Sequence, residues 1–192
     1  MQVYTAITGD RDNRREDVLC FGDAGRFHRP VMEAKIYKIL PHKFFDDNIT
    51  IWVDGNISLK ESPERLVEEF LEDADISCFK HPFRKSIWEE FHVLKNDLRF
   101  NNEWLQTKLR EQEEYYKKLD LQIIGLYECN FLIRRNTPKV RRAMNDWWAE
   151  ICRWQWRDQV SFPYIVCKHK LKVNVINGDI RENNFFNHYE HD

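Results

Sequence analysis

The sequence predicts an α/β fold in which a mostly parallel central sheet is flanked by helices. Strand-like and helix-like segments alternate along most of the 192 residues, and no repeat, low-complexity segment or linker interrupts them. A hydrophobic content of 42%, with 14% aromatic residues, is typical of a folded globule. A chain of this length suits one domain with a sizeable core, so residues 1–192 are expected to form a single domain.

The first half of the chain is expected to contain four strands and two helices. Apolar runs that end at glycine, proline or acidic residues define these elements. A serine followed by a proline is typical of the start of a helix. The expected elements are strands at 2–8 and 17–22, a helix at 30–40, a strand at 49–53, a helix that begins at Ser62 and Pro63, and a strand at 75–79.

The second half continues the alternation and ends in a polar, histidine-rich tail. Its expected elements are a helical region at 86–119 divided at Asn101-Asn102, a strand at 125–136, helices at 138–151 and 158–168, and a strand at 173–176. The tail, at about 178–192, is expected to close over a site formed by the rest of the chain.

Three of the apolar strands end on an acidic residue or on a glycine beside one: Gly9-Asp10, Gly22-Asp23 and Asp54-Gly55. In open α/β sheets, ligands bind beyond the carboxyl ends of the strands. Asp54 would therefore stand where a ligand lies, and Gly55 would let the backbone turn sharply beside it. This edge of the sheet is the predicted site.

The sequence Asp54-Gly55-Asn56 places a carboxylate and an amide oxygen two residues apart. Hard cations such as Mg²⁺ and Mn²⁺ take such oxygens and complete their shell with phosphates and water. The alternative interpretation is an ordinary Asp-Gly turn between two strands. In the tail, His188 and His191 are three residues apart and could add an imidazole ligand, or could belong to a disordered end.

Three further patterns allow both a functional and a structural interpretation. Asp158 begins a helical run, where a carboxylate is stabilised as its anion, so it is either a helix cap or a base at a pocket. Lys35 and Lys38 are at helical spacing, so they either bind a diphosphate or form an exposed helix face. His81 and Arg84 follow a strand end and could hold an anion or belong to a solvated loop.

Several classes of function are disfavoured. The phosphate-binding pattern of P-loop NTPases, the dinucleotide-binding glycine pattern and the hydrolase nucleophile elbow are all missing. A net charge of −2 weighs against nucleic acid as a partner. No apolar run is long enough to cross a membrane. Five separated cysteines with no CxxC pair, and an N-terminus unlike a signal peptide, lead us to expect a cytoplasmic location.

Four stretches taken together resemble a known family. They are AKIYKILPHKFFDDNITIWVDGNISL (34–59), SCFKHPFRKSIWEEFHVLKND (77–97), LYECNFLIRRNTPKVRRAMNDWW (126–148) and RDQVSFPY (157–164). In order and spacing they resemble the glycosyltransferase-like family of the TOD/MUCI type, over about residues 30–165. The resemblance implies a GT-A-like fold that uses a nucleotide-sugar donor of the UDP or GDP type, commonly with a divalent metal, Mn²⁺ or Mg²⁺.

The activity implied by the resemblance is transfer of a hexose or deoxyhexose to a glycan or glycoprotein acceptor. Asn56 departs from the Asp-x-Asp pattern of such enzymes, which implies weaker metal dependence. That departure and the small size of the chain leave open a non-catalytic module that binds nucleotide sugars or glycans with the same fold. A third alternative is a nucleotidyltransferase, which would release pyrophosphate.

The resemblance also assigns roles to single residues. Asp158 is the expected catalytic base for the acceptor hydroxyl. The expected donor-binding residues are Thr8, Gly9, Asp10, Arg11, Lys35, Lys38, His42, Asp54, His81, Arg84 and Gln159. The expected metal ligands are Asp54, Asn56, His188 and His191. Residues 8–11 are assigned to the nucleoside because the first strand–helix loop of such folds usually holds it.

Overall fold

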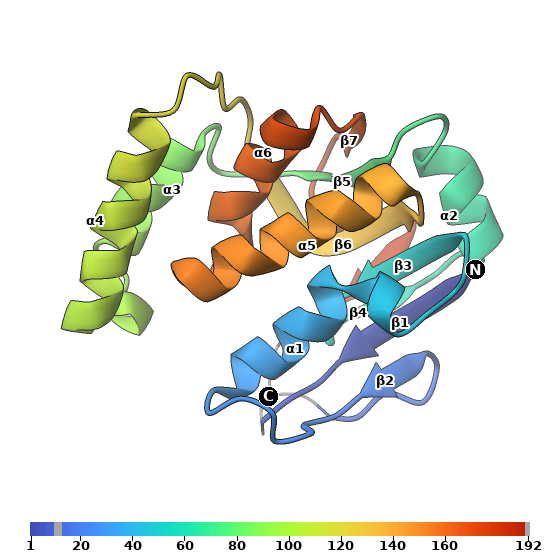
Figure 1. Cartoon of the computed structure of the whole chain (residues 1–192). Coiled ribbons are helices and arrows are strands. Elements are labelled where there is room, and N and C mark those ends of the chain that lie inside the picture. Colours follow the sequence, from blue (N-terminus) through green and yellow to red (C-terminus); the bar gives the residue numbers. More distant parts are fainter. Residues whose placement is uncertain (10–12, 191–192) are drawn as a thin grey trace.

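The computed structural model of this chain describes residues 1–9 and 13–190 (Figure 1). Three short 3-10 turns accompany the helices and strands of this part of the chain. The elements are β1 (Gln2–Ala6), β2 (Leu19–Phe21), α1 (Pro30–Ile39), β3 (Ile49–Val53), β4 (Ile57–Leu59), α2 (Pro63–Phe70), β5 (Ile76–Lys80), α3 (Ile87–Leu94), α4 (Glu103–Lys117), β6 (Tyr127–Arg135), α5 (Pro138–Arg153), α6 (Asp158–His169), β7 (Val173–Ile176) and β8 (Phe186–His188).

A central sheet of six strands, in the order β2-β1-β3-β6-β5-β7, organises the fold. Strands β2, β1, β3, β5 and β7 run in one direction, and β6 is antiparallel to both of its neighbours. The predicted fold class, α/β with a mostly parallel central sheet flanked by helices, is confirmed. Because β1, β3 and β5 are parallel, their carboxyl ends meet at one edge of the sheet.

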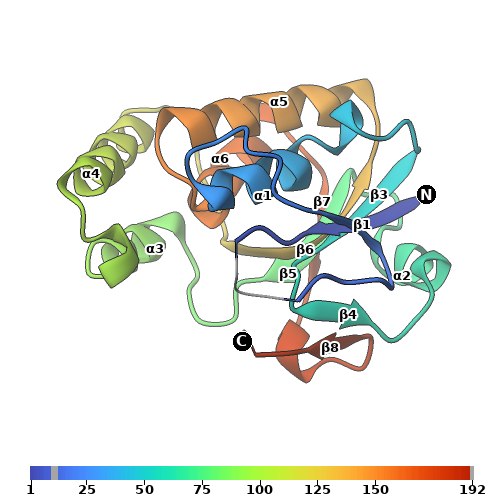
Figure 2. The same ribbon diagram turned by 90° about the horizontal axis from the view of Figure 1, so that it is seen from below.

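The two faces of the sheet are covered differently (Figures 1 and 2). Helices α1, α5 and α6 lie over one face, with α3 and α4 together at one end of the molecule. On the other face lie α2 and a separate two-stranded ribbon in which β4 pairs antiparallel with β8. Thus β8 packs beside the segment that directly follows β3.

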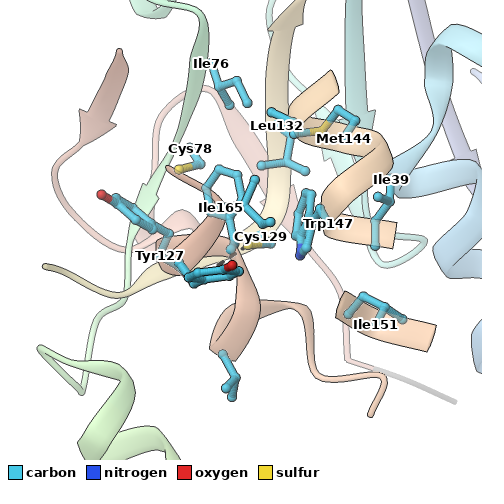
Figure 3. Close-up of a cluster of buried hydrophobic side chains, with 14 of the residues drawn as sticks. Ile39, Ile76, Cys78, Tyr127, Cys129, Leu132, Met144, Trp147, Ile151 and Ile165 are labelled. Atoms are coloured by element: carbon cyan, nitrogen blue, oxygen red, sulfur yellow. Dashed lines mark hydrogen bonds between the residues drawn. The ribbon is translucent and has the colours of Figure 1, made fainter. Parts of the chain in front are cut away.

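Each face has its own apolar core. Under α5 and α6, Trp147, Met144 and Ile165 pack on Leu132 of the sheet, as Figure 3 shows. The opposite core contains eleven buried residues from the described ranges, among them Phe131 of β6. Strand β3 contributes to both cores, which explains why its sequence is one continuous apolar run.

Capping side chains mark the starts of several helices, among them the predicted start of α2 at Ser62. The side chains of Ser62, Ser86 and Thr137 accept hydrogen bonds from backbone N–H groups three residues later. Asn102 does the same for α4, and the predicted break at Asn101-Asn102 lies directly before that helix, although α3 already ends at Leu94. Helix boundaries could therefore be predicted because caps are local features.

The tail differs from a simple polar extension because it contains β8. Three residues, Phe186–His188, pair with β4 in the register Ile57 to His188. Phe186 is buried in the second core, which fixes the ribbon against the sheet. Within residues 1–9 and 13–190, no helix has both the length and the apolar character needed to cross a bilayer.

Candidate functional site

Two adjoining hollows open at the carboxyl ends of β1 and β3. The first, of about 720 Å³, includes Thr8 and Gly9, and the second, of about 510 Å³, includes His81 and His188. Their shared wall consists of Lys35, Lys38, Asp54, Arg99, Arg157 and Asp158. Because of this shared wall we treat them as one cleft, with a first and a second hollow.

Lys38 joins the two acidic residues that the sequence singled out. Its Nζ lies 3.0 Å from Oδ1 of Asp54 and 2.9 Å from Oδ2 of Asp158. One helical turn earlier on α1, the Nζ of Lys35 lies 2.5 Å from the same Asp158 oxygen. Trp52 donates its Nε1–H to Oδ1 of Asp54 at 2.7 Å and so helps to fix the position of that carboxylate. Asp54 and Asp158 therefore face each other across one ammonium group.

Burial strengthens the interactions between the charged groups of this cluster and shifts their pKa values. Burial alone would raise the pKa of Asp158, but the ammonium groups of Lys35 and Lys38 outweigh it and hold that pKa well below its usual range. For Lys38 the two carboxylates outweigh burial and raise its pKa above the ordinary value. For Lys35 burial dominates, and its pKa is lowered despite the contact with Asp158. Asp158 is thus an anion in the ligand-free protein.

Asp158 is the first residue of α6 and not its cap. The cap position belongs to Arg157, and no side chain in the described part of the chain caps this helix end. The carboxylate instead accepts from the N–H of Gln159 at 3.0 Å and from the two lysines. Of the two interpretations open at this position, the structure supports a carboxylate presented to the cleft.

Basic side chains outnumber acidic ones around the cleft. Among the described residues that line it, the basic ones are Arg29, Lys35, Lys38, Arg84, Arg99, Arg157 and Arg181, and the acidic ones are Asp54, Glu128, Asp158 and Glu190. An excess of positive charge in a concave, partly desolvated site favours an anionic ligand. A diphosphate has the right charge for this surface.

The first hollow begins where β1 ends. Gly9 has a φ of +73°, a conformation that favours glycine, and Thr8 donates its hydroxyl to the carbonyl of Pro30 at 2.8 Å. This contact ties the end of β1 to the start of α1. The other two residues predicted for this loop, Asp10 and Arg11, lie outside the described residues.

A buried glutamate organises the second hollow. Glu90, fully buried on α3, pairs with Arg84 and, at 2.9 Å, with Arg157, the residue directly before Asp158. The N–H groups of Phe83 and Arg84 donate to Nδ1 of His81. We did not predict Glu90 from the sequence, although its place on the apolar face of a helix was a usable signal, since an acidic residue there needs a buried partner.

The ring of His81 gives a prediction for the pH dependence of stability. Burial, with the nearby Arg84 guanidinium, lowers its pKa from 6.5 to about 4. The unfolded chain therefore binds this proton more readily, and the free energy of unfolding should fall as the pH drops from about 6.5 toward 4. Urea unfolding over this range should show a shallower fall in the His81→Gln variant than in the wild type. An unchanged slope in that variant would contradict the assignment.

His42 is a predicted donor-binding residue that the structure does not bring to the cleft. It lies in the 3-10 turn Pro41–Lys43, and its Nε2 lies 3.1 Å from Oδ1 of Asn145. Helix α1 starts at the carboxyl edge of the sheet and runs toward the opposite edge. Residues after its end, including His42, are therefore far from Lys35 and Asp54 along the helix axis.

The predicted metal ligands Asp54, Asn56 and His188 all line the second hollow. Nε2 of His188 lies 3.2 Å from Nδ2 of Asn56, and Oδ2 of Asp54 has no partner among the described residues. In that same part of the chain no three His, Cys, Asp or Glu side chains gather as a metal cluster. The donors present fit Mg²⁺ or Mn²⁺ only if a ligand such as a diphosphate completes the shell. His191 lies outside the described residues.

Comparison with known proteins gives one family. Residues 23–191 match the family model described as "TOD1/MUCI70, glycosyltransferase-like domain". Among curated proteins, the chain is similar to "Probable hexosyltransferase MUCI70" of Arabidopsis thaliana, with 24% identity over 153 residues. That alignment covers 73% of this chain and 26% of the relative, so the chain spans about a quarter of the relative's length.

Solved structures give weaker likenesses. The apo form of mouse xyloside xylosyltransferase 1 is 15% identical, with a TM-score of 0.42. The superposition covers 74% of this chain and 50% of the xylosyltransferase chain. The apo WbbM bifunctional glycosyltransferase is 8% identical, with a TM-score of 0.47. The superposition covers 83% of this chain and 28% of the WbbM chain. With TM-scores below 0.5, neither structure enters the reasoning that follows.

Proposed function

This chain belongs to the TOD1/MUCI70 glycosyltransferase-like family, and from that premise we propose that it transfers a hexose or deoxyhexose from a nucleotide sugar of the UDP or GDP type to a glycan or glycoprotein. The observation that supports this best is the meeting of Asp54 and Asp158 on Lys38 in one cleft. A nucleotide-sugar donor needs positive charge for its diphosphate and a nearby base for the acceptor, and both are available there.

The lysine pair would bind the leaving group. When the bond from the sugar to the diphosphate breaks, negative charge grows on the nucleoside diphosphate. Lys35 and Lys38, on consecutive turns of α1, would neutralise that charge in a site that excludes much of the solvent. The nucleoside would extend into the first hollow past Thr8 and Gly9.

Asp158 would act as the base. As the acceptor oxygen bonds to the anomeric carbon and the bond to the diphosphate breaks, the hydroxyl proton would pass to the Asp158 carboxylate. In the ligand-free protein two ammonium groups make this carboxylate a weak base. A bound diphosphate would draw those ammonium groups to its own charge, so the pKa of Asp158 would rise toward its usual range.

A divalent metal, if bound, would supply further positive charge at the diphosphate. Asp54, Asn56 and His188 are the residues of this chain that would hold it. Since Asn56 is uncharged where such sites commonly have a second carboxylate, the lysine pair would provide the larger share of the positive charge.

Asp54 gives the test of the metal site. In wild-type protein, Mn²⁺ should increase the affinity for UDP or GDP. In Asp54→Ala that increase should shrink by about tenfold or more, because the carboxylate that would coordinate the metal is lost. Isothermal titration with and without Mn²⁺ measures both numbers. Asp146→Ala, which changes a residue of α5 outside the cleft, is the control. An increase with Mn²⁺ in Asp54→Ala as large as in the wild type would remove Asp54 from the metal site.

A transfer assay tests the proposed function itself. A panel of UDP- and GDP-sugars with glycan acceptors, in the presence of Mn²⁺, should give release of nucleoside diphosphate from at least one donor. Binding without turnover in every combination would favour the non-catalytic binding module, for which the uncharged Asn56 is the motivating feature. Release of pyrophosphate would identify a nucleotidyltransferase instead.

A further inference from the structure

Two carboxamide side chains that line the second hollow each have an oxygen without a hydrogen-bond partner among the described residues. Oδ1 of Asn130 and Oε1 of Gln159 are shielded from solvent, and neither accepts a hydrogen bond within the described part of the chain. Both residues line the hollow that contains His188, and Gln159 is only 7% exposed. Buried polar atoms without partners destabilise a fold, so such atoms at a cavity wall point to a ligand that satisfies them.

Each carboxamide is held next to one of the two acidic residues of the cleft. The backbone N–H of Asp54 donates to the backbone carbonyl of Asn130 at 2.8 Å. The backbone N–H of Gln159 donates to the side-chain carboxylate of Asp158. The two side chains therefore flank the cluster formed by Asp54, Lys38 and Asp158 on the side of the second hollow.

An irregularity of β6 creates the position of Asn130. Cys78 of β5 pairs with Leu132, but the next residue, Phe79, pairs with Glu128. Residues 129–131 are therefore left out of the β5–β6 ladder, while β6 stays paired with β3 up to Phe131. Such bulges re-aim side chains and are common beside functional sites. The bulge places Asn130 at the cleft.

We propose that Asn130 and Gln159 recognise the transferred sugar by hydrogen bonds to its hydroxyl groups, and so select which donor the protein accepts. This inference rests on the proposed function. With the nucleoside in the first hollow and the diphosphate at Lys35 and Lys38, the sugar of the donor extends into the second hollow. Sugar hydroxyls both donate and accept, so they suit a carboxamide in either orientation.

Substitution by apolar residues of similar shape separates sugar recognition from nucleotide binding. In Asn130→Leu and in Gln159→Met, the affinities for UDP-glucose, UDP-galactose, GDP-mannose or GDP-fucose, whichever the wild type binds best, should fall about tenfold or more. The affinities for UDP and GDP should stay within about twofold. Isothermal titration gives all of these values, and either variant suffices if the other does not fold.

Thr5 offers a matched control. Its hydroxyl oxygen is also buried and without a partner among the described residues, but it lies inside β1 and lines neither hollow. Thr5→Val should leave both affinities unchanged. A second readout is the melting temperature without ligand, which should stay the same or rise in Asn130→Leu because an unsatisfied polar atom is removed. A purely structural role predicts a lower melting temperature.

The possible outcomes separate this inference from the proposed function. Equal losses for nucleotide sugars and for bare UDP or GDP would assign the two carboxamides to the nucleotide and overturn the inference alone. Unchanged affinities for nucleotide sugars in both variants would also overturn it alone. If wild-type protein bound none of the UDP or GDP compounds, the proposed function would fall, and this inference with it.

Discussion

Replacing Asp158 by asparagine is expected to lower kcat for sugar transfer by about 100- to 10,000-fold, the usual contribution of a general base. Affinity for UDP or GDP should be kept or increased. In the wild type, the ammonium groups of Lys35 and Lys38 lie 2.5 and 2.9 Å from the Asp158 carboxylate. The variant lacks this carboxylate, so it no longer competes with the diphosphate for the two lysines. A lower kcat with equal or tighter nucleotide binding distinguishes a base from a residue that merely holds the donor.

Asp146→Asn is the matched control for this substitution. Asp146 pairs with Lys168 and His169 outside the cleft, so its variant should keep wild-type kcat. Circular dichroism should be used to verify that Asp158→Asn is folded, because the change leaves two buried ammonium groups with one carboxylate fewer. Wild-type kcat in a folded Asp158→Asn protein would exclude Asp158 as the base.

Lys38→Met is expected to have the largest effect on stability. The side chain of Lys38 is 4% exposed, and its removal leaves Asp54 and Asp158 facing each other, with the ammonium group of Lys35 still in contact with Asp158. Breaking a buried ion pair on one side costs about 3–5 kcal/mol. For a chain of this size the melting temperature should fall by roughly 10 °C.

The same variant should bind UDP and GDP at least about tenfold more weakly, because one of the two cations that would contact the diphosphate is lost. Lys168→Met is the control, since Lys168 pairs with Asp146 at the surface, where such pairs contribute about 0–1 kcal/mol. A melting temperature and nucleotide affinity equal to those of the wild type would show that Lys38 neither holds the cleft together nor meets the ligand.

The positions of Asp54 and Asp158 could be predicted because their signals are local. An apolar strand that ends on Asp-Gly, and an acidic residue at the start of a helix, define which end of an element each side chain occupies. In a mostly parallel sheet those ends lie at one edge. The sequence left two options for Lys35 and Lys38, and the structure shows that they face the cleft rather than bulk solvent.

The features that escaped prediction depend on contacts between distant segments. Strand β8 forms because Phe186 is buried in the second core and because the backbone of β8 pairs with β4. The polar sequence of the tail indicates neither contact. Asn130 reaches the cleft through a register shift between β5 and β6, which the sequence of one strand cannot reveal. His42 was assigned by resemblance alone, and the direction of α1 takes it to the other edge of the sheet.

A crystal structure of the protein with a bound UDP- or GDP-sugar tests the central claim most directly. We expect the diphosphate between Lys35 and Lys38, the nucleoside beside Gly9, and the sugar beside Asn130 and Gln159. A nucleotide bound elsewhere on the molecule, with Lys38 still bridging Asp54 and Asp158, would contradict the assignment of this cleft as the donor site.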